Sequence, residues 1–138
     1  MAITAKQRPG RMRLIDATKY RLPPAGVVSI LHRVSGLVMF LLLPFIIWMF
    51  DTSLTSEISY GQFTAVFAGG VGFVPGIVFK LIALLLTWAY LHHFIAGLRH
   101  LWMDATHSVT KEFGRQSALV TLGLSIILTA ALGAKLFF

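Results

Sequence analysis

Three long apolar runs, separated by polar or glycine-rich segments, dominate the pattern of hydrophobic positions along the chain. They cover residues 27–50, 77–102 and 117–138. Each run reaches the roughly 20 apolar residues that an α-helix needs to cross the hydrocarbon core of a bilayer. The pattern therefore predicts an all-α membrane protein with three transmembrane helices.

Prolines, glycines and small residues refine these predicted elements. Pro23-Pro24 marks a boundary before the first run, and Pro44, deep inside that run, predicts a kink. Residues 51–76 end in G-G-V-G-F-V-P-G, which predicts a loop, although their phenylalanine-rich middle is also compatible with a short interfacial helix. The third run carries small residues that favour close helix packing, namely Gly123, Ser125, Thr129 and Gly133.

The composition agrees with a membrane protein. Hydrophobic residues make up 57% of the chain and charged residues 12%, about half the charged share of roughly 25% in a soluble domain. The chain has no cysteine, which excludes disulfides and cysteine-held zinc or iron–sulfur clusters within it.

The uneven distribution of positive charge predicts an orientation. Six of the twelve Lys and Arg residues precede residue 22, two lie in residues 104–116, and none lies in residues 51–76. The positive-inside rule therefore places an arm of residues 1–26 in the cytoplasm and the C-terminus in the periplasm. A basic arm can also bind nucleic acid, but beside apolar runs it indicates the cytoplasmic face of a membrane protein.

Three histidines and an arginine lie near the cytoplasmic end of the second run, in the sequence L-H-H-F-I-A-G-L-R-H-L-W-M-D (residues 91–104). Ionisable groups at membrane depth are costly, and they indicate function. His93, Gly97 and His100 share one helical face. A neutral imidazole can ligate haem iron, and a glycine one turn away lets a flat macrocycle approach.

Further polar residues extend this pattern at the same depth. The rise from His93 to His100 is about 10 Å, which suits the distance from haem iron to propionate, so Arg99 and His100 are candidate propionate partners. On the first run, Ser29, His32 and Arg33 share one face with a glycine. Two helices thus place cations at one depth, as a buried anion would require.

Structural roles for the same residues stay open at this point. His92, about 100° from His93 on the helix, suits a hydrogen bond between helices. Arg33 and Arg99 can extend to the headgroups, and Ser29 can bond to its own helix.

Two stretches resemble motifs of a known family. S-I-L-H-R-V-S-G (residues 29–36) and H-x-x-x-G-L-R-H-L-x-x-D (residues 93–104) are similar to those of the cytochrome b556 membrane-anchor subunits of succinate dehydrogenase. The three-span layout and Arg8-Pro9 are similar too. At the N-terminus the family commonly reads R-P-x-S-P-H-L, whereas G-R-M-R-L (residues 10–14) follows Pro9 here.

The resemblance implies that His93 is an axial ligand of haem b, and that a second membrane-anchor subunit supplies the other ligand within a shared helical bundle. It implies that Ser29 and Arg33 line a ubiquinone pocket, and that His32, Arg99 and His100 face the propionates. Succinate would be oxidised on a flavoprotein subunit, and electrons would reach the quinone through an iron–sulfur subunit. The chain would then carry no catalytic residue for dicarboxylate oxidation and would lie in a bacterial inner membrane.

Other functions remain as alternatives. The chain is also compatible with a haem-free structural anchor, or with the anchor of a fumarate reductase. A small transporter is less compatible, because the third run has no ionisable residue except Lys135, and the sequence shows no pair of broken helices.

Overall fold

The computed structural model describes residue 15 and residues 20–137 of the chain. Most of the predicted cytoplasmic arm, including Arg8-Pro9 and the divergent residues 10–14, lies outside the described residues. These contain the helices α2 (Pro24–Leu41), α3 (Leu43–Leu54), α4 (Glu57–Gly69), α5 (Gly76–Thr106) and α6 (Lys111–Phe137). Within residues 20–137 there is no strand, only an isolated bridge between Val71 and Val74.

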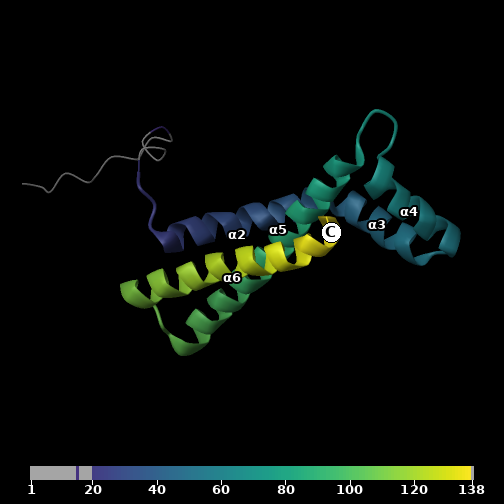
Figure 1. Cartoon of the computed structure of the whole chain (residues 1–138). Helices are drawn as coiled ribbons and strands as arrows, with labels where there is room; N and C mark the ends of the chain where they lie inside the picture. The colour runs from purple at the N-terminus through teal and green to yellow at the C-terminus, as the bar shows by residue number, and fades with distance from the viewer. Residues whose placement is uncertain (1–14, 16–19, 138) are drawn as a thin grey trace, which may run out of the picture.

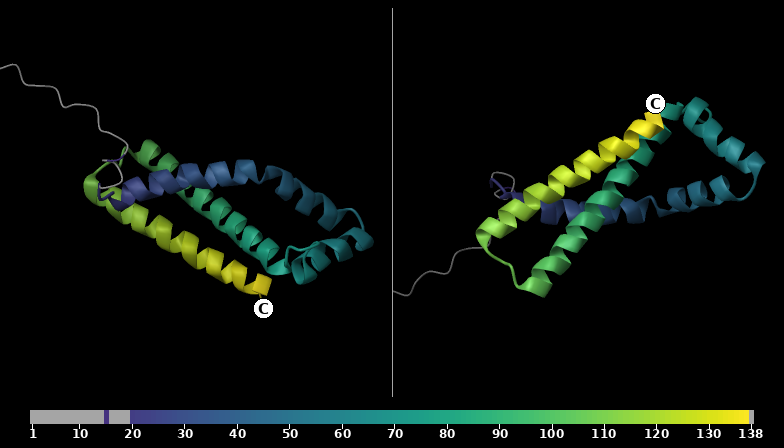
Figure 2. Two further views of the ribbon diagram at one scale, coloured as in Figure 1. Left: turned by 90° about the horizontal axis from the view of Figure 1, so that it is seen from above. Right: turned by 60° about the horizontal axis from the view of Figure 1, so that its bottom comes forward.

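Three of these helices, α2, α5 and α6, are long and apolar enough to cross a membrane. Helix α5 packs against both α2 and α6, which also contact each other. Helix α5 crosses the other two at an angle, and α3 and α4 form a hairpin at one end (Figures 1 and 2). We call this end the hairpin end. The prediction of an all-α fold with three spans is confirmed.

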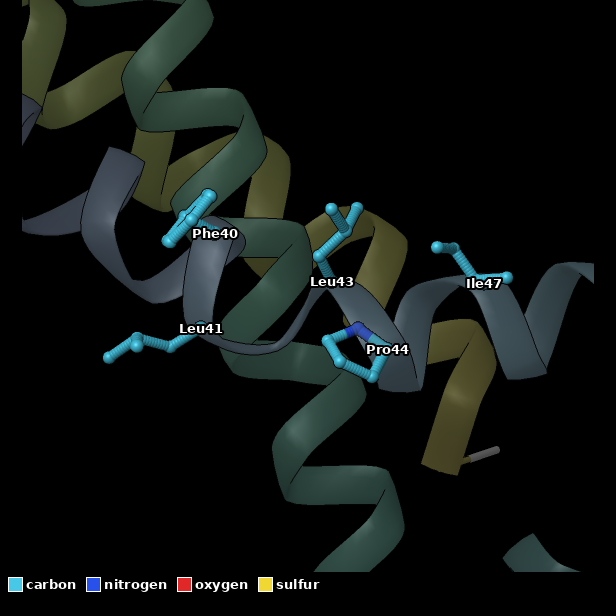
Figure 3. Close-up of a pocket in the computed structure, with 5 residues that line it drawn as sticks. All are labelled: Phe40, Leu41, Leu43, Pro44 and Ile47. Carbon is cyan, nitrogen blue, oxygen red and sulfur yellow. The ribbon is translucent and has the colours of Figure 1, made fainter.

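The first apolar run is divided into two helices. Helix α2 ends at Leu41 and α3 begins at Leu43. Pro44 has no backbone N–H, and its ring clashes with the carbonyl four residues earlier, so the helix cannot continue undisturbed through this point. The predicted kink is therefore a break, which Figure 3 shows with Pro44 beside it. A hollow of about 650 Å³ at the break has only apolar lining residues: Phe40, Leu41, Leu43, Pro44 and Ile47.

The segment predicted as a loop is largely helical. Helix α3 continues through Asp51 to Leu54, and α4 contains the phenylalanine-rich middle. A reciprocal capping box of Ser56 and Ser59 begins α4, since each side chain bonds the backbone N–H of the other residue. A turn with positive φ at Gly70 and Gly72 then leads into α5. The phenylalanine-rich middle of the segment is thus a short helix rather than a loop.

Small side chains occupy the centre of the bundle. Val28, Ala96 and Ala118, from α2, α5 and α6, form one buried cluster, and each is 0% exposed. Gly133 approaches α5 so closely that an added Cβ would lie 2.5 Å from Leu84 Cδ1, whereas Gly123 faces open space. Large apolar residues point outward instead; Phe40 is 72% exposed. This distribution suits helices that meet through small residues and present bulky ones to lipid or to another subunit.

Candidate functional site

The His93 imidazole lies in the interface between α5 and α2. Its Nδ1 atom is 3.0 Å from the carbonyl oxygen of His32 and 3.3 Å from Ser35 Oγ. A carbonyl can only accept, so the His93 Nδ1–H donates to it. The Ser35 hydroxyl donates its own proton to the same carbonyl at 2.8 Å and can therefore only accept from His93. Both contacts select one tautomer, in which Nε2 carries the free lone pair.

Gly36 provides the space for this ring. An added Cβ at Gly36 would lie 3.0 Å from His93 Cε1 and 3.3 Å from its Nδ1. Ser35, which is fully buried, and Gly36 were not predicted as partners of His93. They lie three and four residues after His32 in the S-I-L-H-R-V-S-G stretch, and this spacing was the signal that could have identified them as partners of His93.

Two more histidines adjoin His93. The centroid of the His32 ring is 4.2 Å from that of His93 and 5.3 Å from that of His100. His32 Nε2 lies over Gly97, where an added Cβ would be 3.8 Å away. The structure thus brings together His32, His93, Gly97 and His100 from two helices. No group of described His, Asp or Glu side chains could hold a metal ion by itself, so an ion bound through His93 needs ligands from elsewhere.

Arg99 is held by α6. Its Nε atom donates to Ser117 Oγ at 2.9 Å, and its Nη2 atom donates to the carbonyl of Gly114 at 3.2 Å. His93 instead contacts α2. Two residues of α5, six positions apart, therefore bond to different helices. The sequence did not predict this link, and the propionate role of Arg99 stays a prediction.

Ser29 and Arg33 have no polar partner within the part of the chain that the structure describes. Arg33 is exposed and Ser29 is partly buried, and no described residue hydrogen-bonds to either side chain. Their donors are therefore not used by any described residue.

His92 performs the structural role expected of a hydrogen bond between helices. It is fully buried, it stacks on Trp88 at a centroid distance of 5.5 Å, and its Nδ1 is 3.2 Å from Ser125 Oγ on α6. Ser125 Oγ donates to the carbonyl of Leu122 at 3.0 Å, so it accepts from His92. Consecutive histidines therefore face different helices.

The chemistry of His93 fits a haem ligand. Histidines that bind metals almost always donate their second ring N–H to a carbonyl, a carboxylate or water, which fixes the ring and makes the ligating nitrogen more basic. His93 makes this bond to His32, and its Nε2 has no partner among the described residues. A neutral imidazole is a type of ligand that haem iron accepts.

Comparisons with known proteins identify the family of this chain. Residues 5–132 match the family described as succinate dehydrogenase/fumarate reductase transmembrane subunits. The succinate dehydrogenase cytochrome b556 subunit of Coxiella burnetii (strain RSA 493 / Nine Mile phase I) is 32% identical over 113 residues, which cover 82% of this chain and 86% of that protein. The subunit of the same name from Paracoccus denitrificans is 30% identical over 122 residues, 86% of this chain and 85% of that protein. The succinate dehydrogenase cytochrome b560 subunit of Reclinomonas americana is 30% identical over 112 residues, 81% and 76% of the two chains.

Proposed function

The chain belongs to the family of succinate dehydrogenase/fumarate reductase transmembrane subunits, and on this premise we propose that it binds haem b and helps form the ubiquinone-reduction site of a succinate:ubiquinone oxidoreductase. Its partners are a second membrane-anchor subunit, an iron–sulfur subunit and a flavoprotein subunit. The N-terminal arm lies in the cytoplasm, and the three helices cross a bacterial inner membrane.

The bond from His93 Nδ1–H to the His32 carbonyl is the observation that carries the haem proposal. It fixes the tautomer and the ring plane, so that Nε2 keeps a free lone pair with which His93 would hold the iron of haem b. Haem b supplies a reversible one-electron couple when it is bound. The second anchor subunit would supply the other ligand of the iron.

His32 and His100 bind the propionates in this proposal. Their rings lie 5.3 Å apart, and ring N–H groups can donate charge-assisted hydrogen bonds to a carboxylate. Arg99, the residue before His100, also donates to a propionate in this proposal. A guanidinium has five N–H donors, and the contacts with Ser117 and Gly114 use two of them.

Ser29 and Arg33 contribute to the quinone site. The Ser29 hydroxyl donates to a quinone carbonyl, and the Arg33 guanidinium stabilises the negative charge that develops on the oxygen during reduction. Both donors lack partners within the described chain, which supports their use at a site completed by the neighbouring subunits.

The reduced-minus-oxidised spectrum of the purified membrane complex tests the haem proposal. We expect His93→Ala to abolish the b-type α band, while succinate oxidation with an artificial acceptor continues. His107→Asn is a matched control, because His107 has φ 55° in the α5–α6 connection and asparagine tolerates that conformation.

Two outcomes would count against the ligand assignment. An unchanged α band in His93→Ala would show that His93 does not bind the iron. A wild-type complex without any α band would favour the haem-free anchor. If His93→Ala prevents assembly, His93→Gly with added imidazole replaces it, and the return of the band is the expected result.

A further inference from the structure

A second pocket lies at the hairpin end of the bundle. It has a volume of about 500 Å³ and is lined from all four of α3, α4, α5 and α6, a size within the range of about 300–1,000 Å³ for ligand sites. We call it the hairpin pocket. Lys80, which lines it, is thirteen residues from His93 on α5, an axial separation of about 20 Å. The hairpin pocket is therefore separate from the histidine site.

Two lysines line the hairpin pocket without a balancing acid. Lys80 lies near the start of α5 and Lys135 near the end of α6, and both line the pocket, whose lining contains no Asp or Glu. Neither lysine forms an ion pair with any described residue; Lys80 Nζ lies 5.6 Å from the centroid of the Phe137 ring. Two positive charges with no acidic partner among the described residues therefore adjoin one cavity.

The rest of the lining is suited to a ligand with apolar chains. Phe63 and Phe67 are in contact, with ring centroids 4.9 Å apart, and they line the pocket together with Ala83. Tyr60 adds a phenolic hydroxyl that has no hydrogen bond among residues 20–137, whereas Thr64 bonds to its own helix. Cations and a free hydroxyl next to aromatic walls match a phosphate with attached acyl chains.

We propose that the hairpin pocket binds the phosphate headgroup of an anionic phospholipid in the leaflet at this end of the bundle. Lys80 and Lys135 neutralise the phosphate, and the acyl chains lie against the apolar walls. Lys and Arg are less frequent on the periplasmic side of membrane proteins than on the cytoplasmic side, and the orientation proposed above places this end of the bundle on the periplasmic side. A lipid phosphate between the two lysines gives a reason for their presence. The proposal does not depend on haem or quinone binding.

Lipid retention by the purified complex tests this site. The native complex is washed in detergent, and bound phosphatidylglycerol and phosphatidylcholine are measured by mass spectrometry. We expect the wild type to retain phosphatidylglycerol preferentially. A basic residue near a membrane surface strengthens binding of anionic lipid about fivefold. Lys80→Gln and Lys135→Gln should each weaken retention by about this factor, and the double variant by roughly the product.

Controls separate this site from general charge effects and from free phosphate. Lys111→Gln removes a positive charge at the opposite end of the bundle and should leave retention unchanged. Melting temperature in phosphatidylglycerol nanodiscs, relative to phosphatidylcholine nanodiscs, should rise for the wild type and not for the double variant. Equal retention by wild type and double variant, equal loss in Lys111→Gln, or the same protection from inorganic phosphate alone would each overturn the proposal.

Discussion

The Nδ1 atom of His93 lies 3.0 Å from the backbone carbonyl oxygen of His32. This contact joins α5 to α2 through a backbone group, so no side-chain substitution at position 32 removes the acceptor. The orientation of the proposed iron ligand is thus set by the distance between two helix backbones. Gly36, which has no side chain, lies against the His93 ring and allows the two helices to approach each other here.

Enlarging Gly36 should displace the His93 ring. In Gly36→Val the Cβ alone would lie 3.0 Å from His93 Cε1, and overpacking of this kind costs about 1–3 kcal/mol. We expect a lower haem-to-protein ratio and a lower melting temperature of the complex. Gly123→Val is the matched control, because Gly123 faces open space on α6. Equal haem content in both variants would contradict the packing argument.

Removing the free donors of α2 should impair quinone reduction selectively. Hydrogen bonds to charged groups contribute about 1.5–3 kcal/mol, so Ser29→Ala and Arg33→Leu should each lower succinate–quinone reductase activity roughly tenfold or more. Succinate oxidation with an artificial acceptor and the haem spectrum should be unchanged. Ser53→Ala, an exposed hydroxyl on the hairpin, is the control. Parallel loss of both activities would instead indicate defective assembly.

The His92–Ser125 pair should stabilise the packing of α5 on α6. Ser125→Ala leaves a buried N–H without its acceptor, at a cost of about 1–3 kcal/mol. His92→Phe removes the donor, and the double variant should then lose less than the sum of the single variants. Thermal melting of the four complexes gives this comparison. Additive losses would show that the two side chains act independently.

Arg99 has two proposed roles that differ in their measurable effects. Ser117→Ala removes one contact of Arg99 with α6, and we expect a modest loss of stability without a change in haem potential. Arg99→Leu removes the charge as well, and if Arg99 contacts a propionate the haem midpoint potential should shift. Arg99→Lys keeps the positive charge but lacks the planar set of N–H donors of the guanidinium. A potential unaffected in Arg99→Leu would limit Arg99 to joining the helices.

The sequence predicted most of the helical framework, because it depends on local properties. Apolar runs of sufficient length identified three spans, and helical phase correctly placed His93 and His100 on one face near His32. Helical phase also separated His92 from His93. Pro44 correctly located the disturbance of the first span, but it predicted a kink, whereas the structure has a break at Leu42.

The partners of each polar side chain were harder to predict, because they depend on the relative position of two helices. Ser35 and Gly36 contact His93 only because α2 and α5 cross at that level. Arg99 donates to Ser117 and Gly114 of α6. The residues around Arg99 in the sequence do not indicate whether its hydrogen-bond acceptor is α6 or a propionate. The prediction of a loop at residues 51–76 missed much of the helical hairpin. The phenylalanines in this segment were compatible with either a loop or a short helix, and the sequence did not distinguish the two.

The opposite directions of His92 and His93 have a mechanical consequence. One side chain ties α5 to Ser125 on α6, and the next ties it to the backbone of α2. Rotation of α5 about its own axis in either sense would stretch one of the two bonds. Sliding along the axis would stretch both. The two hydrogen bonds therefore restrain both rotation and sliding of α5 at the level of the proposed iron ligand.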